Sequence, residues 1–152
     1  TRRMTASAAT SATRTWARFA FGSWTDPSST APPPDTAFDP PLLRSLGIWP
    51  FVYRALRAAD DGRARAFADD YRHATTANLI RLTRGAQVSA ALAEHGVTAV
   101  ALKGVAFTLR FCAEHPGLRP MADLDLLVPR AQYADAVAVL VGRGFVAADS
   151  ET

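Results

Sequence analysis

Cysteine, lysine and long hydrophobic runs are scarce in this sequence of 152 residues. Its single cysteine, Cys112, excludes an internal disulfide and a cysteine-rich metal site, and it suits a reducing, cytoplasmic location. The longest largely apolar runs, residues 97–102 and 136–141, are far shorter than the ~18 to 20 residues that cross a bilayer, so we expect no membrane span. The histidines lack metal-ligand spacing, and no Gly-x-Ser-x-Gly motif is present to anchor an acyl-transfer triad.

The composition is typical of a soluble globular protein, with 49% hydrophobic and 20% charged residues. The net charge of +3 is unevenly distributed, because residues 1–59 carry seven Arg and three Asp, whereas residues 60–152 carry ten basic and eleven acidic residues. The positive excess therefore belongs to the front of the chain. Arginine provides sixteen of the seventeen basic residues, so the one lysine, Lys103, stands out.

Residues 1–40 combine Thr, Ser, Ala and Arg with a proline-rich stretch at residues 31–35, and this composition predicts a disordered tail and linker. Aromatic and arginine residues lie together at residues 14–24, and such a cluster can stack on nucleic acid bases or lie at a membrane interface. The four arginines of residues 1–40 are few for an electrostatic footprint on nucleic acid. A segment that docks on its own protein, or stays mobile, is therefore the favoured interpretation, and nucleic acid is not an expected partner.

Residues 41–96 have the apolar periodicity of helices, which predicts a helical N-terminal layer. A first helix around Leu42 to Leu46 should end or kink at Pro50, and a long helix should run from about Gly62 to His95, with Gly96 as its stop. The inner stripe expected for the long helix consists of Phe67, Tyr71, Leu79, Leu82, Ala86 and Leu92.

Residues 97–152 change to alternating strands and helices. Strands are expected at 97–102, at 123–128 and from Phe145 to Ala148, with helices at 104–114 and 131–141 between them. This order predicts an α/β (α+β) fold, in which a small mixed sheet accompanies the helical N-terminal layer.

Asp123 and Asp125 carry the strongest chemical signal. Residues i and i+2 of a strand point to the same face, so the two carboxylates should lie side by side. Close carboxylates repel each other unless a cation lies between them, and such hard oxygen ligands suit Mg²⁺, which holds nucleoside triphosphates for phosphoryl or nucleotidyl transfer. The alternative is a solvated aspartate pair on an edge strand.

Lys103 and Gly104 lie where the first strand meets a helix. A helix N-terminus attracts phosphate, glycine lets a ligand approach the backbone, and lysine adds a positive charge, although an ordinary turn with a solvated lysine is equally compatible. The segment is not a Walker loop, because it lacks the Gly-x-x-x-x-Gly-Lys-Ser/Thr arrangement. Arg119, just before the acidic segment (residues 121–128), is either an ion-pair partner of the aspartates or a second phosphate contact.

These residues together resemble the uncharacterised nucleotidyltransferase family of the polymerase-beta-like nucleotidyltransferase superfamily. The resemblance covers about residues 62–148 and rests on Leu102-Lys103-Gly104, Arg119, the segment from Asp123 to Val128, Leu140 and Gly144-Phe145. It implies a minimal nucleotidyltransferase core, with Asp123 and Asp125 as catalytic metal ligands, Lys103-Gly104 in place of the phosphate loop, and Arg119 at the position of the pattern's arginine.

The chain departs from this superfamily in two respects. Gly104 is followed by Val105 and not by the usual Ser or Gly. A third carboxylate on a later strand is also expected, and Asp149 and Glu151 come too early for that position. We therefore expect the chain to be C-terminally truncated, to bind Mg²⁺ and nucleotide poorly, and to need an extension beyond Thr152 for turnover.

The leading functional hypothesis is a Mg²⁺-dependent transfer of a nucleoside monophosphate from a nucleoside triphosphate such as ATP to an unknown acceptor, either a small molecule or a protein. The alternative is a catalytically inactive module on the same fold that senses nucleotides or binds proteins. A nucleic-acid binder that uses the Arg and Trp residues of the tail is a third, weaker reading.

Overall fold

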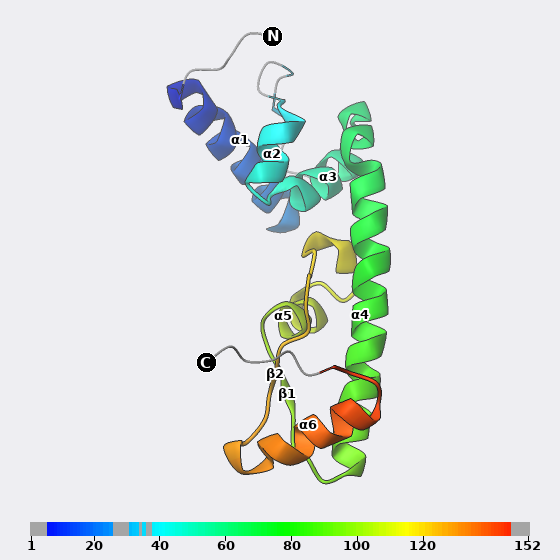
Figure 1. The fold of residues 1–152 in the computed structure, drawn as a ribbon. Helices are drawn as coiled ribbons and strands as arrows, with labels where there is room; N and C mark the ends of the chain where they lie inside the picture. The colour runs from blue at the N-terminus through cyan, green and yellow to red at the C-terminus, as the bar shows by residue number, and fades with distance from the viewer. Residues whose placement is uncertain (1–5, 26–30, 34, 36–37, 147–152) are drawn as a thin grey trace. The chain divides into compact units, whose positions relative to one another are not determined.

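The computed structural model describes residues 6–25, 31–33, 35 and 38–146, except for the side chains of residues 6–9 and 23–25. Its described part is mostly helical, with one small sheet (Figure 1). Tertiary contacts divide the chain into two compact units, Thr1–His73 and Ala74–Thr152. The dividing point lies inside helix α4 (Ala68–Glu94), and each unit is described by itself.

The first unit is built from four short elements and the start of α4. These are α1 (Ala6–Thr25), α2 (Pro40–Ser45), α3 (Trp49–Ala58) and the 3₁₀ helix η2 (Gly62–Phe67). Asp39 caps α2 by accepting a hydrogen bond from the Leu42 N–H, and Asp61 caps η2 in the same way through the Arg63 N–H. Proline lies in the first turn of both α2 and α3, where its missing N–H leaves no hydrogen bond unmade.

Helix α1 lies in the range for which the sequence predicted a disordered tail, so the structure differs from that expectation. The side chains of Ala12, Trp16, Phe19 and Ala20 form one helical stripe and are buried. Trp16, only 1% exposed, packs in an apolar core with Leu43, Val52 and Phe67. Trp16 and Phe19 are therefore not exposed for stacking on nucleic acid bases, and burial of these rings is what stabilises the segment as a helix.

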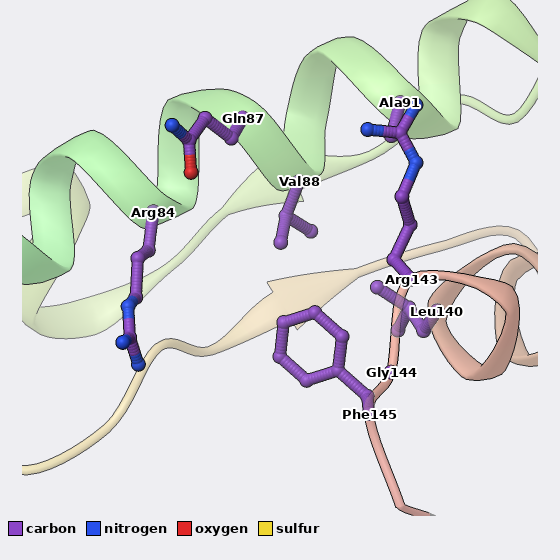
Figure 2. A pocket seen from close by; sticks show the side chains of 8 residues that line it. All are labelled: Arg84, Gln87, Val88, Ala91, Leu140, Arg143, Gly144 and Phe145. Atoms are coloured by element: carbon purple, nitrogen blue, oxygen red, sulfur yellow. The ribbon is translucent and has the colours of Figure 1, made fainter.

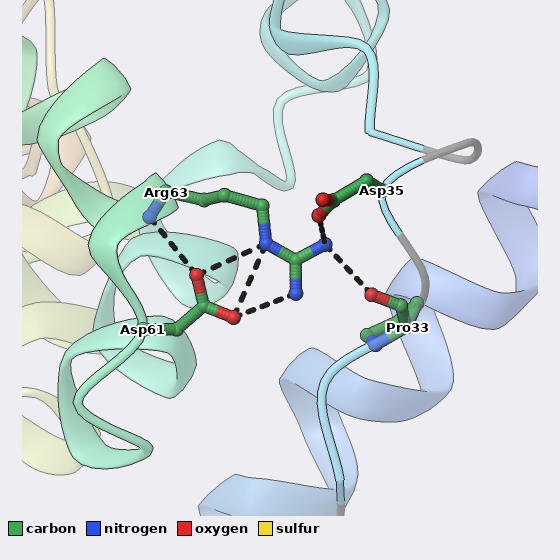
Figure 3. A network of polar contacts seen from close by, with 4 residues as sticks. All are labelled: Pro33, Asp35, Asp61 and Arg63. Atoms are coloured by element: carbon green, nitrogen blue, oxygen red, sulfur yellow. Dashed lines mark hydrogen bonds and ion pairs between the residues drawn. The ribbon is translucent and has the colours of Figure 1, made fainter.

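Arg63 ties this unit together through its guanidinium group. It forms a fork with the Asp61 carboxylate, at 2.6 Å from Nη2 to Oδ2, and also contacts Asp35 and the Pro33 carbonyl oxygen (Figure 3). The guanidinium also lies 5.4 Å from the centre of the Trp16 ring. The hydrogen bonds from the Arg63 side chain lower the pKa of Asp61 below its ordinary value. The contacts of Arg63 with Pro33 and Asp35 fix part of the segment that precedes α2 to η2.

The second unit contains the rest of α4 and the only sheet among the described residues. The elements after α4 are β1 (Val100–Ala101), α5 (Lys103–Phe111), η3 (Pro116–Leu118), β2 (Leu126–Leu127), η4 (Arg130–Gln132) and α6 (Tyr133–Gly142). Strands β1 and β2 are antiparallel, with Val100 opposite Leu127 and Ala101 opposite Leu126. The apolar core of this unit consists of Leu92, Val97 and Ala136, against which Val88, Leu126 and Val128 pack.

The two helices expected after residue 103 are confirmed within a few residues, and so is a helix stop at Gly142 to Gly144, where Gly144 adopts φ +87°. The strands are shorter than expected, and the sheet is antiparallel instead of mixed. Of the third expected strand, Phe145 and Val146 are not in a strand, and Ala147 and Ala148 lie outside the described residues.

The inner stripe expected for the long helix was wrong at two positions. Leu79 is 51% exposed and Ala86 is exposed, whereas Asn78 and Gly85 are buried. The reason is that the buried face of α4 includes the amide of Asn78 and Gly85, which has no side chain. Apolar periodicity detects neither residue. Phe67 and Leu92 are buried as expected.

Within the described part of the chain, no helix is both long and apolar enough to span a membrane.

Candidate functional site

The pairing of β1 with β2 brings the lysine and the acidic segment together. The Leu102 N–H donates to the Asp125 carbonyl oxygen at 2.9 Å, which continues the antiparallel register by one residue beyond Ala101 and Leu126. Lys103 follows directly, and its Nζ lies 3.2 Å from Oδ2 of Asp125. Residues 22 positions apart in the sequence thus form one ion pair where β1 meets α5.

The backbone of Lys103 is strained. It adopts φ +45°, a left-handed conformation that costs a residue with a Cβ about 1 to 2 kcal/mol. The ion pair does not explain this cost, because the lysine side chain is 69% exposed and the aspartate 31%, and exposed pairs contribute about 0 to 1 kcal/mol. Strained non-glycine residues concentrate at functional sites, which makes Lys103 a candidate for a role beyond stability.

Gly104 lies against Met121, the residue that opens the acidic segment. A Cβ at Gly104 would lie 2.9 Å from Met121 Cγ and 3.0 Å from its Sδ, so the Met121 side chain would have to shift. Glycine thus lets α5 pack closely against Met121. The backbone approach that the sequence suggested for a ligand is, in the structure, made by a side chain of the protein itself.

Asp123 and Asp125 lie on either side of Leu124, in the irregular stretch just before β2 and not within the strand itself. Leu124 points to α4, since a methyl group added at Gly85 would lie 3.6 Å from its Cδ2. Asp123 is exposed and, among the described residues, has no ion-pair partner, whereas Asp125 faces Lys103. The Lys103 ammonium shows that a cation fits against the Asp125 carboxylate.

Arg119 does not pair with the aspartates. Its guanidinium lies over the Phe107 ring of α5, 5.5 Å from the ring centre, and in the described part of the chain no carboxylate forms an ion pair with it. Its side chain is exposed. Of the two roles that the sequence left open, the ion-pair role is thus absent from this arrangement.

Asn78 is a residue that sequence reasoning missed. It is fully buried, its Nδ2 donates to the carbonyl oxygens of Pro116 (2.6 Å) and Arg119 (2.8 Å), and its Oδ1 accepts from the Met121 N–H (3.0 Å). One side chain of α4 thus fixes the loop that leads into the acidic segment. A polar residue between apolar helical positions was the only signal for it.

The ligand chemistry fits Mg²⁺ held jointly with a substrate. No group of three His, Cys, Asp or Glu side chains suited to a metal occurs where the structure describes the chain. Mg²⁺ is commonly bound by one or two carboxylates, with water and substrate phosphates completing its coordination, so two aspartates suit a metal that arrives with a nucleotide.

The comparisons with known proteins give one positive result. No curated protein and no solved structure matches the chain. A family model described as an uncharacterised nucleotidyltransferase matches residues 41–152, and this range contains every site residue discussed above. Because the match covers well over half of the sequence, the chain belongs to the uncharacterised nucleotidyltransferase family.

Proposed function

We propose that Lys103, Asp123 and Asp125 form the triphosphate-binding site of a Mg²⁺-dependent nucleotidyltransferase. The observation that carries the proposal is Lys103 itself, which is held at φ +45° with its ammonium 3.2 Å from Asp125. Membership of a nucleotidyltransferase family supports the reaction class. The single cysteine suits a reducing cytoplasmic compartment.

Asp123 and Asp125 would hold Mg²⁺, which neutralises charge on the phosphates and polarises the phosphorus centre when bound. With Mg²⁺ held there, Asp125 would no longer be the partner of the Lys103 ammonium, which would then bind a phosphate oxygen. A compact ammonium on a flexible stem suits this change of partner better than a guanidinium, which matters in a chain whose other basic residues are all arginine.

The first turn of α5 and Arg119 would complete the contacts with the nucleotide. This nine-residue helix begins with Lys103 and Gly104, its N-cap Leu102 makes no side-chain cap hydrogen bond, and helix N-termini favour phosphate. Arg119 has no carboxylate partner in the described part of the chain, so its guanidinium is free for a phosphate oxygen. Its stacking on Phe107 restricts where that group lies.

The proposed reaction forms a bond between an acceptor oxygen and the α-phosphorus of the triphosphate. It breaks the bond between the α-phosphorus and the oxygen that joins the α- and β-phosphates. Pyrophosphate leaves, and the acceptor, a small molecule or a protein, retains the nucleoside monophosphate. The side chains named above position and neutralise the triphosphate, which is the main requirement of this chemistry.

A second candidate is a module that senses nucleotides, or binds proteins, without turnover. It is favoured by the donor set, since the described residues provide two aspartates and no group of three metal-ligating side chains. The transferase and the nucleotide-sensing form of this module share the triphosphate site and differ only in whether pyrophosphate is released.

The test measures binding and turnover on the same samples. The chain is titrated with ATP, GTP, CTP and UTP with and without Mg²⁺, followed by NMR amide shifts, which detect millimolar affinity. We expect Mg²⁺-dependent shifts at residues 102–104 and 123–126 that are lost in Asp125→Asn but kept in Arg130→Gln, an exposed arginine at η4. Pyrophosphate release by the chain, or by a version extended at the C-terminus, supports the transferase, and nucleotide binding without release by either one supports the sensing module. Absence of Mg²⁺-dependent nucleotide binding would overturn both.

A further inference from the structure

A pocket of the second unit lies between α4 and the end of α6. It has a volume of about 510 Å³, within the range of about 300 to 1,000 Å³ that is usual for small-molecule sites. Helix α4 provides Arg84, Gln87 and Val88, and the chain at the end of α6 provides Leu140, Arg143 and Phe145 (Figure 2). Nothing in the proposed triphosphate site uses these residues.

The lining combines apolar side chains, an aromatic ring and two cations. Val88 and Leu140 are the larger apolar side chains, and the Phe145 ring is 48% exposed, which is a large exposure for an aromatic side chain. Arg143 is neutralised by Glu94, with Nη2 3.1 Å from Oε2. Arg84 has no ion-pair partner among the residues that the structure describes, so its positive charge is left for a ligand.

The pocket lies next to the acidic segment. Arg84 precedes Gly85, the residue over which Leu124 packs, and Leu124 lies between the two aspartates. Val88 belongs to the same apolar cluster as Leu126 of β2, which follows Asp125 directly. Arg84 is thus the pocket residue next to the contact between Gly85 and Leu124, and the Phe145 ring lies farther along the pocket (Figure 2).

We propose that this pocket binds the base and sugar of the donor nucleotide whose phosphates lie at Lys103 and Asp125. This inference rests on the proposed function. The base stacks on Phe145, Gln87 offers an amide donor and acceptor to the base edge, and Arg84 binds a phosphate or sugar oxygen. A base has π faces for the exposed ring and the apolar side chains and a hydrogen-bonding edge for Gln87, so one ligand suits these parts of the lining.

The experiment uses NMR titrations of the chain with three probes: ATP with Mg²⁺, adenosine, and inorganic tripolyphosphate with Mg²⁺. We expect adenosine to shift the amides of Gln87, Val88 and Phe145, tripolyphosphate to shift those of residues 102–104, and ATP to shift both groups. Phe145→Leu keeps an apolar side chain but removes the ring, and it should weaken ATP and adenosine binding about tenfold while leaving tripolyphosphate unchanged. Arg84→Gln should weaken ATP binding in the same way, and Arg130→Gln should change neither.

The outcomes separate this inference from the function on which it rests. If ATP still binds through Lys103 and Asp125 while Phe145→Leu and Arg84→Gln have no effect, the pocket assignment is overturned and the triphosphate site survives. If adenosine binds in the pocket without competing with ATP, the pocket belongs to another ligand, which also overturns the assignment. If no nucleotide binds at all, both proposals fail. Arg84 is exposed, so Arg84→Gln keeps the test valid even if Phe145→Leu unfolds.

Discussion

Replacement of Asn78 by alanine tests how the loop before the acidic segment is held. The substitution removes two hydrogen bonds to carbonyl oxygens and one from the Met121 N–H, all three made by a fully buried amide. Each such bond contributes about 0.5 to 1.5 kcal/mol, and a buried donor left without a partner costs about 1 to 3 kcal/mol. We therefore expect a loss of roughly 3 kcal/mol of unfolding free energy, which is more than a hundredfold in the unfolding equilibrium.

The assay follows amide hydrogen exchange in the second unit, with tryptophan fluorescence as a separate probe. Trp16, Trp24 and Trp49 are the only tryptophans of the chain and all belong to the first unit, so their fluorescence does not report directly on Asn78. Protection should fall most at the Met121 amide, which loses its acceptor.

The neighbouring residue provides the matched control. Leu79 is 51% exposed, so Leu79→Ala should change stability by no more than about 0.5 kcal/mol. If Leu79 instead lay on the inner stripe, as its periodicity suggested, the same change would cost about 2 to 5 kcal/mol. A larger loss in Leu79→Ala than in Asn78→Ala would refute the reasoning.

Asn78→Asp gives a signed pH dependence. The introduced carboxyl would face two carbonyl oxygens in a buried site, which raises its pKa in the folded state. A carboxyl group whose pKa is higher in the folded than in the unfolded state stabilises the folded protein at pH values below its unfolded-state pKa. This contribution is lost as the pH rises through its folded-state pKa. The variant should therefore be least stable near neutral pH and should regain protection as the pH falls toward about 4, in contrast to Asn78→Ala.

Three further predictions concern the backbone of Lys103, the packing of Gly104 and the titration of Asp61. Lys103→Gly should be about 1 kcal/mol more stable than Lys103→Ala in thermal or urea unfolding, because only glycine relieves the positive φ; equal stabilities would argue against strain. Gly104→Ala should lose about 1 to 3 kcal/mol through contact with Met121, and Met121→Ala should relieve part of that loss in the double variant. In the first unit, the lowered pKa of Asp61 stabilises the folded protein at pH values above the ordinary value of 3.8, and this stabilisation is lost as the pH falls. The Tm detected by tryptophan fluorescence should therefore decrease below about pH 4, and it should decrease less steeply in Arg63→Gln.

Elements with simple apolar periodicity were predictable from the sequence. Helices α5 and α6 and the glycine stop after Gly142 appear close to where the pattern placed them. The family resemblance implied that Lys103 and Asp125 belong to one core, and the structure places the Lys103 Nζ 3.2 Å from Asp125 Oδ2. This contact depends on the antiparallel register between Leu102 and Asp125, which joins residues far apart in the sequence and leaves no local signal.

Polar and small residues account for the differences. In α1 the stripe of Ala12, Trp16, Phe19 and Ala20 has helical spacing, but a serine- and threonine-rich composition concealed it. Asn78 and Gly85 are buried because one satisfies a loop and the other accommodates Leu124, and hydrophobicity detects neither role. The positive φ at Lys103 was not predictable, because among residue types only glycine signals a left-handed backbone.

The most direct test of the central claim locates the metal. Mn²⁺, which accepts the same oxygen ligands as Mg²⁺, is added to the chain with ATP, and paramagnetic broadening of amide signals is measured. We expect residues 102–104 and 123–126 to broaden first, and this broadening to disappear in Asp123→Asn and Asp125→Asn. A control pair of carboxylates exists at the start of α4, and Asp69→Asn and Asp70→Asn should change nothing. Broadening centred on Asp69 and Asp70, or unchanged by loss of Asp125, would contradict the proposed nucleotidyltransferase site.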